Sequence, residues 1–410
     1  APAAASGPGA PPSGGTTSGD RAAIGFAMVA LFVAAANLRP AIAAVSPLVD
    51  RIRTDLDLSA TGVSFLTTVP TLAMGVCAPL AAAIGRRHGL QRGVLIGLAV
   101  VAVATAARGL GDSTWLQLSC AGIVGAGIAI AQTLLPAVVK ARFASRAGLV
   151  TGIYTAGLGL GGAVAAGVSA PLADALDSWP GALASWALLA VAGMVMWTAA
   201  KGSLRLDSVD GPKGPATKGL PWRSATAWRI TAIAAANSAL YYCELAWIAP
   251  LLHDAGGYTE SHSGFLLTVM ISIQVVAMIG VPMVLGERAD KRVGLAVTAA
   301  LTAVGFFGFA FSPGTGTWLW IIAMGIGHGG LFTLVLTVPV SMSRDAAEAG
   351  RYSAMAFFVG YGCAALGPVL VGGLRDATGD YRLAFAILGA MTALMLLPIS
   401  GLTRRDPAPD

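Results

Sequence analysis

Three ionisable side chains of this 410-residue chain stand within long apolar stretches, namely Arg39, Glu244 and His328. A guanidinium carries a fixed fork of hydrogen-bond donors that suits a carboxylate or another small anion, and it does not readily lose its proton. A carboxyl group or an imidazole can instead take up and release a proton near neutral pH when burial shifts its pKa. These residue types therefore predict a solute site with proton exchange beside it.

Arg39 lies in the first apolar stretch, directly before Pro40. An ionised residue within a membrane-spanning helix is costly, so it usually faces the protein interior or a water-filled cavity and serves a function. A residue before proline is pushed away from helical dihedral angles, which predicts a local break in this helix. Two roles are open for Arg39, a direct contact with solute or a purely structural charge, and we favour the first.

The seventh apolar stretch carries Asn237, Tyr241 and Glu244 at positions i, i+4 and i+7. This spacing places them on one helical face, which we expect to line a cavity. For Glu244 two roles are compatible. It could form a structural ion pair with Arg39, or it could be a carboxyl group that takes up a proton.

Other polar residues within apolar stretches are candidates for the same site. His328 either hydrogen-bonds a neighbouring helix or faces the cavity, where it could also exchange protons. Taken one at a time, most such residues are better explained as interhelical hydrogen bonding. The remaining candidate solute contacts are Asn37, Gln132, Tyr154 and Tyr361.

The composition predicts an all-α membrane protein with twelve transmembrane helices. Of the residues, 56% are hydrophobic and only 11% are charged, whereas a typical soluble domain has about 25% charged residues. A membrane-spanning helix needs about 20 mostly apolar residues. Twelve stretches meet this requirement, near residues 22–49, 60–84, 93–110, 115–139, 148–172, 181–200, 225–252, 261–285, 293–312, 317–342, 350–374 and 381–402.

The basic residues predict how these spans are oriented. Of the 26 Lys and Arg residues, 20 fall in termini and loops on one side and 5 on the other, and Arg39 is left inside a span. Cytoplasmic loops carry the excess of Lys and Arg, so both termini are expected to be cytoplasmic. The net charge of +6 then reflects topology, and no nucleic-acid partner is expected. Arg39 and Glu244 are the only charged residues expected inside the spans.

Short repeats predict that the chain consists of two related halves. The sequence AAAN at 34–37 recurs at 234–237, FLTTV at 65–69 recurs as FLLTV at 265–269, and Gly125 and Gly127 recur as Gly325 and Gly327. This common spacing of 200 residues favours a duplicated six-helix unit with a solute site between the halves. The expected segments are a disordered tail at 1–20, a six-helix bundle at 21–200, a cytoplasmic linker at 201–223, a second bundle at 224–403 and a tail at 404–410.

Several other classes of site are disfavoured by the motifs. Two G-x-G-x-x-G runs, at 157–162 and 325–330, lie inside apolar spans, where close helix packing explains them better than a dinucleotide does. The sequence has no G-x-x-x-x-G-K-[ST] motif, and its four cysteines fall inside predicted spans. We expect no cofactor, no metal site and no enzymatic activity.

Motifs spread over nearly all twelve predicted spans resemble one group of permeases. They are NLRP at 37–40, LTTVP at 66–70, LLPAVVKARF at 134–143, GLVTGIYT at 148–155, GIGHGG at 325–330, SAMA at 353–356, GY at 360–361 and LGP at 366–368. On these residues the chain resembles the cyanate and nitroimidazole permease branch of the major facilitator superfamily.

The resemblance implies a monomeric permease of the bacterial inner membrane, built from two pseudo-symmetric six-helix bundles, which moves a small solute by alternating access without ATP hydrolysis. It also strengthens the case for Gln132, Tyr154 and Tyr361 as solute contacts. The sequence departs from the family pattern in three places. His328 replaces an expected Gln, Gln132 replaces a more usual Asn, and Arg86 replaces an expected acid between the second and third spans.

These observations favour a secondary transporter for a small anionic or polar solute, such as a cyanate-like or small organic anion, coupled to protons. An exporter of nitroimidazole-like or other drug-sized compounds is the main alternative. A membrane sensor that does not transport is a second one. Exchange of labelled solute across vesicles separates transport from sensing.

Overall fold

The computed structural model describes residues 18–58, 60–204, 206, 219–286 and 290–402, and the regular structure within these ranges is helical. The first half of the chain contains α1 Ser18–Ala36, α2 Pro40–Ala43, η1 Ser46–Leu48, α3 Val49–Asp55, α4 Ala60–Ala107, η2 Arg108–Leu110, α5 Thr114–Phe143, η3 Ala144–Arg146, α6 Ala147–Leu176, α7 Trp179–Ala199 and α8 Lys201–Leu204. The second half contains α9 Ala225–Asp254, α10 Glu260–Leu285, α11 Lys291–Phe311, α12 Thr317–Met342, α13 Ala346–Thr378, α14 Arg382–Leu394 and α15 Leu396–Ser400.

These helices account for the twelve predicted spans. Within the described residues, nine helical stretches are long and apolar enough to cross a membrane. Two of them, of 43 and 63 residues, hold two spans each. The remaining span is α9, whose apolar run is interrupted by Asn237 and Glu244.

Two departures from regular helix geometry shape the first half. The predicted break before Pro40 is confirmed, because α1 ends at Ala36 and α2 begins at Pro40. In α4, Gly89 has φ 80° and ψ 164°, a backbone conformation that glycine adopts at little cost. This residue separates the second span from the third.

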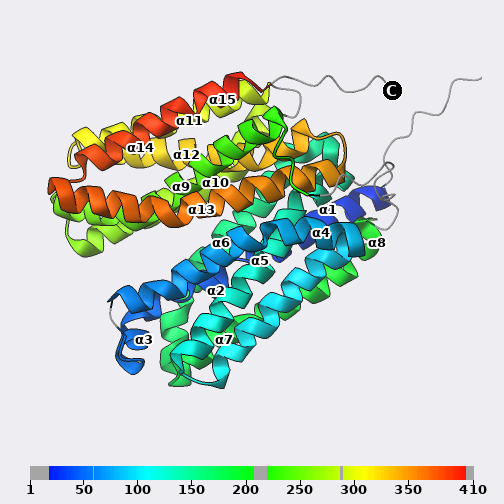
Figure 1. Cartoon of the computed structure of the whole chain (residues 1–410), viewed down its shortest axis with the longest axis horizontal. Helices are drawn as coiled ribbons and strands as arrows, with labels where there is room; N and C mark the ends of the chain where they lie inside the picture. The colour runs from blue at the N-terminus through cyan, green and yellow to red at the C-terminus, as the bar shows by residue number, and fades with distance from the viewer. Residues whose placement is uncertain (1–17, 59, 205, 207–218, 287–289, 403–410) are drawn as a thin grey trace, which may run out of the picture.

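Figure 1 shows the helices in two bundles, α1 to α7 and α9 to α15. The bundles lie closest on the right of this view, near the start of α1 and the end of α15, and they diverge toward α3 and the α13–α14 connection. Packing between the bundles involves α4 with α13, α5 with α13, and α6 with α10 and α12. The predicted tails, 1–20 and 404–410, and the linker 201–223 lie largely outside the described residues, so their boundaries remain predictions.

The 200-residue repeat recurs in the packing of the two bundles. Gly125 of α5 lies against the backbone of Pro70, and Gly325 of α12 lies against the backbone of Met270, which is again 200 positions later. Gly127 contacts Val101 in the same manner as Gly327 contacts Leu301 and Thr302. A Cβ atom on Gly125, Gly127 or Gly327 would lie 2.3 to 3.0 Å from these neighbours, and one on Gly325 would lie 3.3 Å from the Met270 carbonyl and 2.5 Å from the side chain of Ile273. Small residues thus allow the same close helix contacts in both halves.

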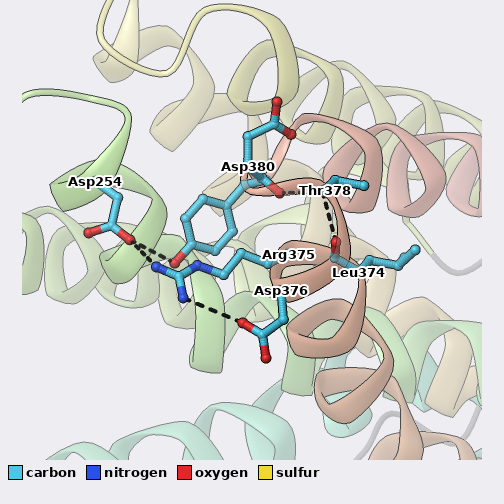
Figure 2. Close-up of polar contacts among 7 residues, drawn as sticks. Asp254, Leu374, Arg375, Asp376, Thr378 and Asp380 are labelled. Atoms are coloured by element: carbon cyan, nitrogen blue, oxygen red, sulfur yellow. Dashed lines mark hydrogen bonds and ion pairs between the residues drawn. The ribbon is translucent and has the colours of Figure 1, made fainter.

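Where the bundles diverge, the following two ion pairs each connect residues of one bundle. In the second bundle, Arg375 Nη2 lies 3.0 Å from Asp254 Oδ2, and the Tyr381 hydroxyl donates to the same oxygen at 3.1 Å (Figure 2). In the first bundle, Arg51 pairs with Asp174 at 2.6 Å. Hydrogen bonds between described residues also join the bundles. Arg39 donates to Tyr242, and Thr155 bonds the hydroxyl of Thr333 at 2.9 Å.

Candidate functional site

Arg39 occupies the break of the first span and points across to the other bundle. It is the residue immediately before α2, with φ −107° and ψ −31°. Its Nη1 donates to the hydroxyl of Tyr242 at 3.1 Å, and its Cζ lies 5.8 Å from the centre of the Tyr241 ring. Among the described residues no carboxylate pairs with it, and a guanidinium over an aromatic face gains a cation–π attraction. Arg39 therefore keeps a positive charge without an anionic partner.

A small cavity lies between the bundles around this guanidinium. Its volume is about 20 Å³, which is room for roughly one water molecule. The first bundle contributes two polar side chains, Arg39 and Gln132, and the second contributes mostly aromatic and aliphatic ones together with Asn237 and Ser238. The lining residues are Arg39, Gln132, Ala234, Asn237, Ser238, Tyr241, Tyr242, Phe332, Val335, Leu336, Phe357 and Tyr361.

The structure brings five of the predicted solute contacts onto this cavity. They are Arg39, Gln132, Asn237, Tyr241 and Tyr361. The buried carbonyl oxygens of Gln132 and Asn237 have no hydrogen-bond partner among the described residues. Because an unsatisfied buried polar group is costly, these two oxygens are free to accept from a bound molecule or water.

The other predicted contacts do not line this cavity. Asn37 Nδ2 donates to the carbonyl of Val33 at 2.7 Å, and its amide lies against Gly193 of α7. Asn37 therefore supports the break itself. Tyr154 is fully buried in α6, and His328 belongs to a separate polar cluster next to the cavity.

This cluster joins Glu244, His328 and Gln274, which come from α9, α12 and α10. His328 Nδ1 lies 2.6 Å from Glu244 Oε2, and Gln274 Nε2 donates to Glu244 Oε1 at 2.7 Å. All three residues are at most 2% exposed. The Nε2 atom of His328 has no hydrogen-bond partner within the described ranges.

The ion pair between Arg39 and Glu244 that the sequence left open is not formed in this structure. The Tyr241 ring is close to both sites, with its centre 5.8 Å from Arg39 Cζ and 6.1 Å from the centre of the His328 ring, which pairs with Glu244. Glu244 instead faces the interior of its own bundle. The two ionisable sites are therefore neighbours that share Tyr241.

Sequence reasoning was wrong about one cation and missed another contributor. Arg108, one of the five basic residues placed on the outer side, is only 1% exposed, so the expectation that Arg39 and Glu244 are the only charged residues inside the spans is wrong. Gln274 was not predicted, although an amide within the apolar stretch 261–285 is a visible signal. Tyr242 was not among the predicted contacts either, and its hydroxyl accepts from Arg39.

The backbone of α6 approaches the broken span closely. A Cβ atom on Gly161 would lie 2.0 Å from the carbonyl oxygen of Ala36, and one on Gly157 would lie 2.5 Å from that of Phe32. Gly162 contacts the side chain of Arg39 itself. This close packing fixes the position of the break and the position from which the Arg39 side chain extends.

Two helix bundles that enclose a polar cavity, with an unpaired cation at a broken helix, define a membrane carrier for small solutes. The family model described as Major Facilitator Superfamily matches residues 22–368. The chain belongs to this family.

Curated relatives agree with the resemblance seen in the sequence. The 2-nitroimidazole transporter of Escherichia coli (strain K12) is 30% identical over 372 residues, which cover 91% of this chain and 93% of the relative. The cyanate transport protein CynX of the same organism is 30% identical over 359 residues, 88% of this chain and 92% of the relative. The predicted branch is thereby confirmed.

Solved structures share the fold. The proton:xylose symporter XylE gives a TM-score of 0.76 at 13% identity, with 93% of this chain and 96% of that chain covered. The human organic anion transporter MFSD10 gives a TM-score of 0.70 at 14% identity, with 93% and 100% covered. The family and these relatives indicate a multi-pass membrane transporter of small molecules rather than an enzyme.

Proposed function

We propose that this protein is a proton-coupled secondary transporter that moves a small anionic or polar solute by alternating access. The observation that carries the proposal is the environment of Arg39. Its guanidinium lines the central cavity and bonds a neutral hydroxyl of the opposite bundle instead of a carboxylate. A small anion that enters between the bundles would supply the missing negative charge.

The remaining contacts would orient the solute. Gln132 and Asn237 present carbonyl oxygens without partners, and Tyr241, Tyr361 and Phe357 supply aromatic faces on the cavity. A small planar solute could therefore stack on the aromatic rings and hydrogen-bond to the two amides. Asn37 would act indirectly by supporting the break. Tyr154 would have to enter the site in another state of the cycle.

Proton coupling is assigned to the cluster of Glu244, His328 and Gln274. The unpartnered Nε2 of His328 is the place where a proton would be accepted. Charge at this cluster would act on Arg39, since the Tyr241 ring neighbours both Arg39 and His328. The opposing explanation is that the cluster only joins three helices of the second bundle.

The setting of the transporter is the bacterial inner membrane, with both termini in the cytoplasm and the protein acting as a monomer. The orientation is supported by the basic residues, of which 20 of 26 fall on the side of the termini. With this orientation, the bundles lie closest on the cytoplasmic side and diverge toward the outside (Figure 1).

Counterflow in proteoliposomes tests the proposal directly. Proteoliposomes that contain the full chain are loaded with unlabelled cyanate, 2-nitroimidazole or another small anion, and uptake of the labelled compound is followed. Arg39→Ala is expected to abolish binding and exchange while the protein stays folded, and Arg39→Lys to restore little. The matched control is Arg53→Ala, which removes an exposed arginine from α3.

A thermal-shift screen of small anions and heterocycles covers solutes outside that set, because ligands that bind the folded state raise its melting temperature. Specific ligands should stabilise the natural protein and Arg53→Ala but not Arg39→Ala. Equal stabilisation of all three would remove Arg39 from the site.

A second candidate is an exporter of nitroimidazole-like compounds. It is favoured by the aromatic lining of the cavity and by the relative named as a 2-nitroimidazole transporter. Inside-out and right-side-out vesicles distinguish the two functions. An exporter accumulates labelled 2-nitroimidazole only in the inside-out vesicles when the proton gradient is applied in its physiological sense.

A further inference from the structure

We propose that Arg108 is a positioning residue, whose buried guanidinium holds the short helix after the break and thereby fixes Arg39 on the central cavity. The effect on transport rests on the function proposed above. The effect on the broken helix does not, and it can be measured in the empty protein.

Arg108 reaches inward from the end of the third span. Its Nη1 donates to the carbonyl oxygen of Ala41 at 2.7 Å. The peptide that carries Arg108 is itself fixed, because Gln117 Nε2 donates to the carbonyls of Arg108 and Gly111 at 2.8 Å each. The guanidinium is thus a rigid tie between α4 and α2.

The acceptor is a carbonyl that the break leaves without a helical partner. The carbonyls at the end of any helix lack donors from the following turn, and α2 has only four residues. The amides of Ala43 and Ala44 bond the carbonyls of Arg39 and Pro40, and the amide of Val45 bonds that of Ile42. Among the described residues, the carbonyl of Ala41 between them receives its hydrogen bond from Arg108.

Burial of this cation is costly, which argues that the contact has a purpose. An arginine near the end of a span can extend its side chain toward water. Arg108 is instead 1% exposed, its Nε has no hydrogen-bond partner, and it pairs with no carboxylate within the described ranges. Since a buried charge without a counter-charge destabilises the fold, the bond to Ala41 is the gain that offsets the cost.

The distance along the chain from this tie to the solute site is short. Ala41 lies two residues after Arg39, and Pro40 between them restricts the backbone. A shift of α2 would therefore be passed on to the Arg39 backbone. Arg39 in turn would lose its placement toward the hydroxyl of Tyr242.

Hydrogen–deuterium exchange of the full chain in lipid nanodiscs tests the tie without any solute. In Arg108→Met, amides of residues 33–48 are expected to exchange roughly ten-fold faster, the loss expected when a hydrogen bond from a charged group is removed. Arg108→Lys should restore most of the protection, because it keeps a cationic donor. Arg53→Met, which removes an exposed outer arginine, should leave this segment unchanged.

Two results would overturn the proposal. One is unchanged exchange of residues 33–48 in folded Arg108→Met. The other is an equal increase in all helices, which would make Arg108 a general support of the fold. If Arg108→Met does not fold, Gln117→Leu loosens the same peptide, and a selective increase in the same segment is again required.

The transport arm separates this proposal from the proposed function. With a probe anion that binds the natural protein but not Arg39→Ala, Arg108→Met should raise KM and change kcat little. Unchanged KM would overturn the link from Arg108 to Arg39 while leaving the proposed function intact. If every anion that binds the natural protein also binds Arg39→Ala equally well, the proposed function is refuted, and the exchange result still stands.

Discussion

The first and seventh spans share the short sequence AAAN, at 34–37 and at 234–237, but differ in structure directly after it. The first span breaks between Ala36 and Pro40, whereas α9 continues as one helix of 30 residues. Where the first half has Arg39 and Pro40, the second half has Ala239 and Leu240. The two spans thus differ in both the cation and the break at the same two positions.

The ionisable groups of the two spans also face different surroundings. Arg39 leaves its own bundle to bond Tyr242, while Glu244 turns into its bundle toward His328 and Gln274. The ionisable group of the first span therefore lies at the interface between the bundles, and that of the seventh span lies within a bundle. This division suits a carrier in which solute and proton are bound at separate, adjacent sites.

The largest test of this division is Glu244→Gln. The amide keeps the size of the side chain but cannot carry a proton, so accumulation driven by a pH gradient should be lost. Counterflow, which needs no net proton movement, should remain. Asp254→Asn, at the C-terminal end of the same helix, is the control. Full accumulation by Glu244→Gln would show that Glu244 has only a structural role.

The second test compares how much room the neighbouring helix has for an added methyl group beside each of the two spans. In Gly161→Ala the new methyl group would lie 2.0 Å from the carbonyl of Ala36 at the break, and overpacking of this kind costs about 1–3 kcal/mol. In Gly360→Ala the new methyl group would meet Ser238 of α9 at 3.2 Å, which a small shift relieves. Thermal unfolding in detergent should show a clear loss of stability for Gly161→Ala and little for Gly360→Ala. Similar losses would mean that the break needs no special fit.

The smallest test uses the two asparagines. Asn37 donates to the backbone at the break, so Asn37→Ala should lower the free energy of unfolding by about 1 kcal/mol. Asn237 lines the cavity and its carbonyl oxygen has no partner among the described residues. Asn237→Ala should therefore leave stability unchanged and weaken solute binding. The reverse pattern would contradict the assigned roles.

Much of this organisation could be predicted from the sequence, because it depends on local properties. Apolar runs predict the spans, and the Arg39-Pro40 pair predicts the break through backbone sterics. The 200-residue repeat predicts the paired packing of Gly125 and Gly325. Of the three residues that helical periodicity places on one face, Asn237 and Tyr241 line the cavity as expected, whereas Glu244 does not.

The partners of buried charges could not be predicted in this way. Whether Glu244 meets Arg39 or His328 depends on the rotation of α9 against α10 and α12, which no spacing along one helix records. Arg108 poses a similar problem. At the end of an apolar run, an arginine can reach outward to water or inward to a carbonyl, and only the packing of α2 decides.

The central cavity, at about 20 Å³, is too small for a file of water molecules. In this conformation the described residues leave room for little more than one water molecule beside Arg39. The scarcity of water limits a leak of protons across the membrane. Cargo of any size must wait until the bundles separate, so its apparent affinity falls with the fraction of time that the site is open. A well-sealed carrier of this design is therefore expected to bind its cargo weakly.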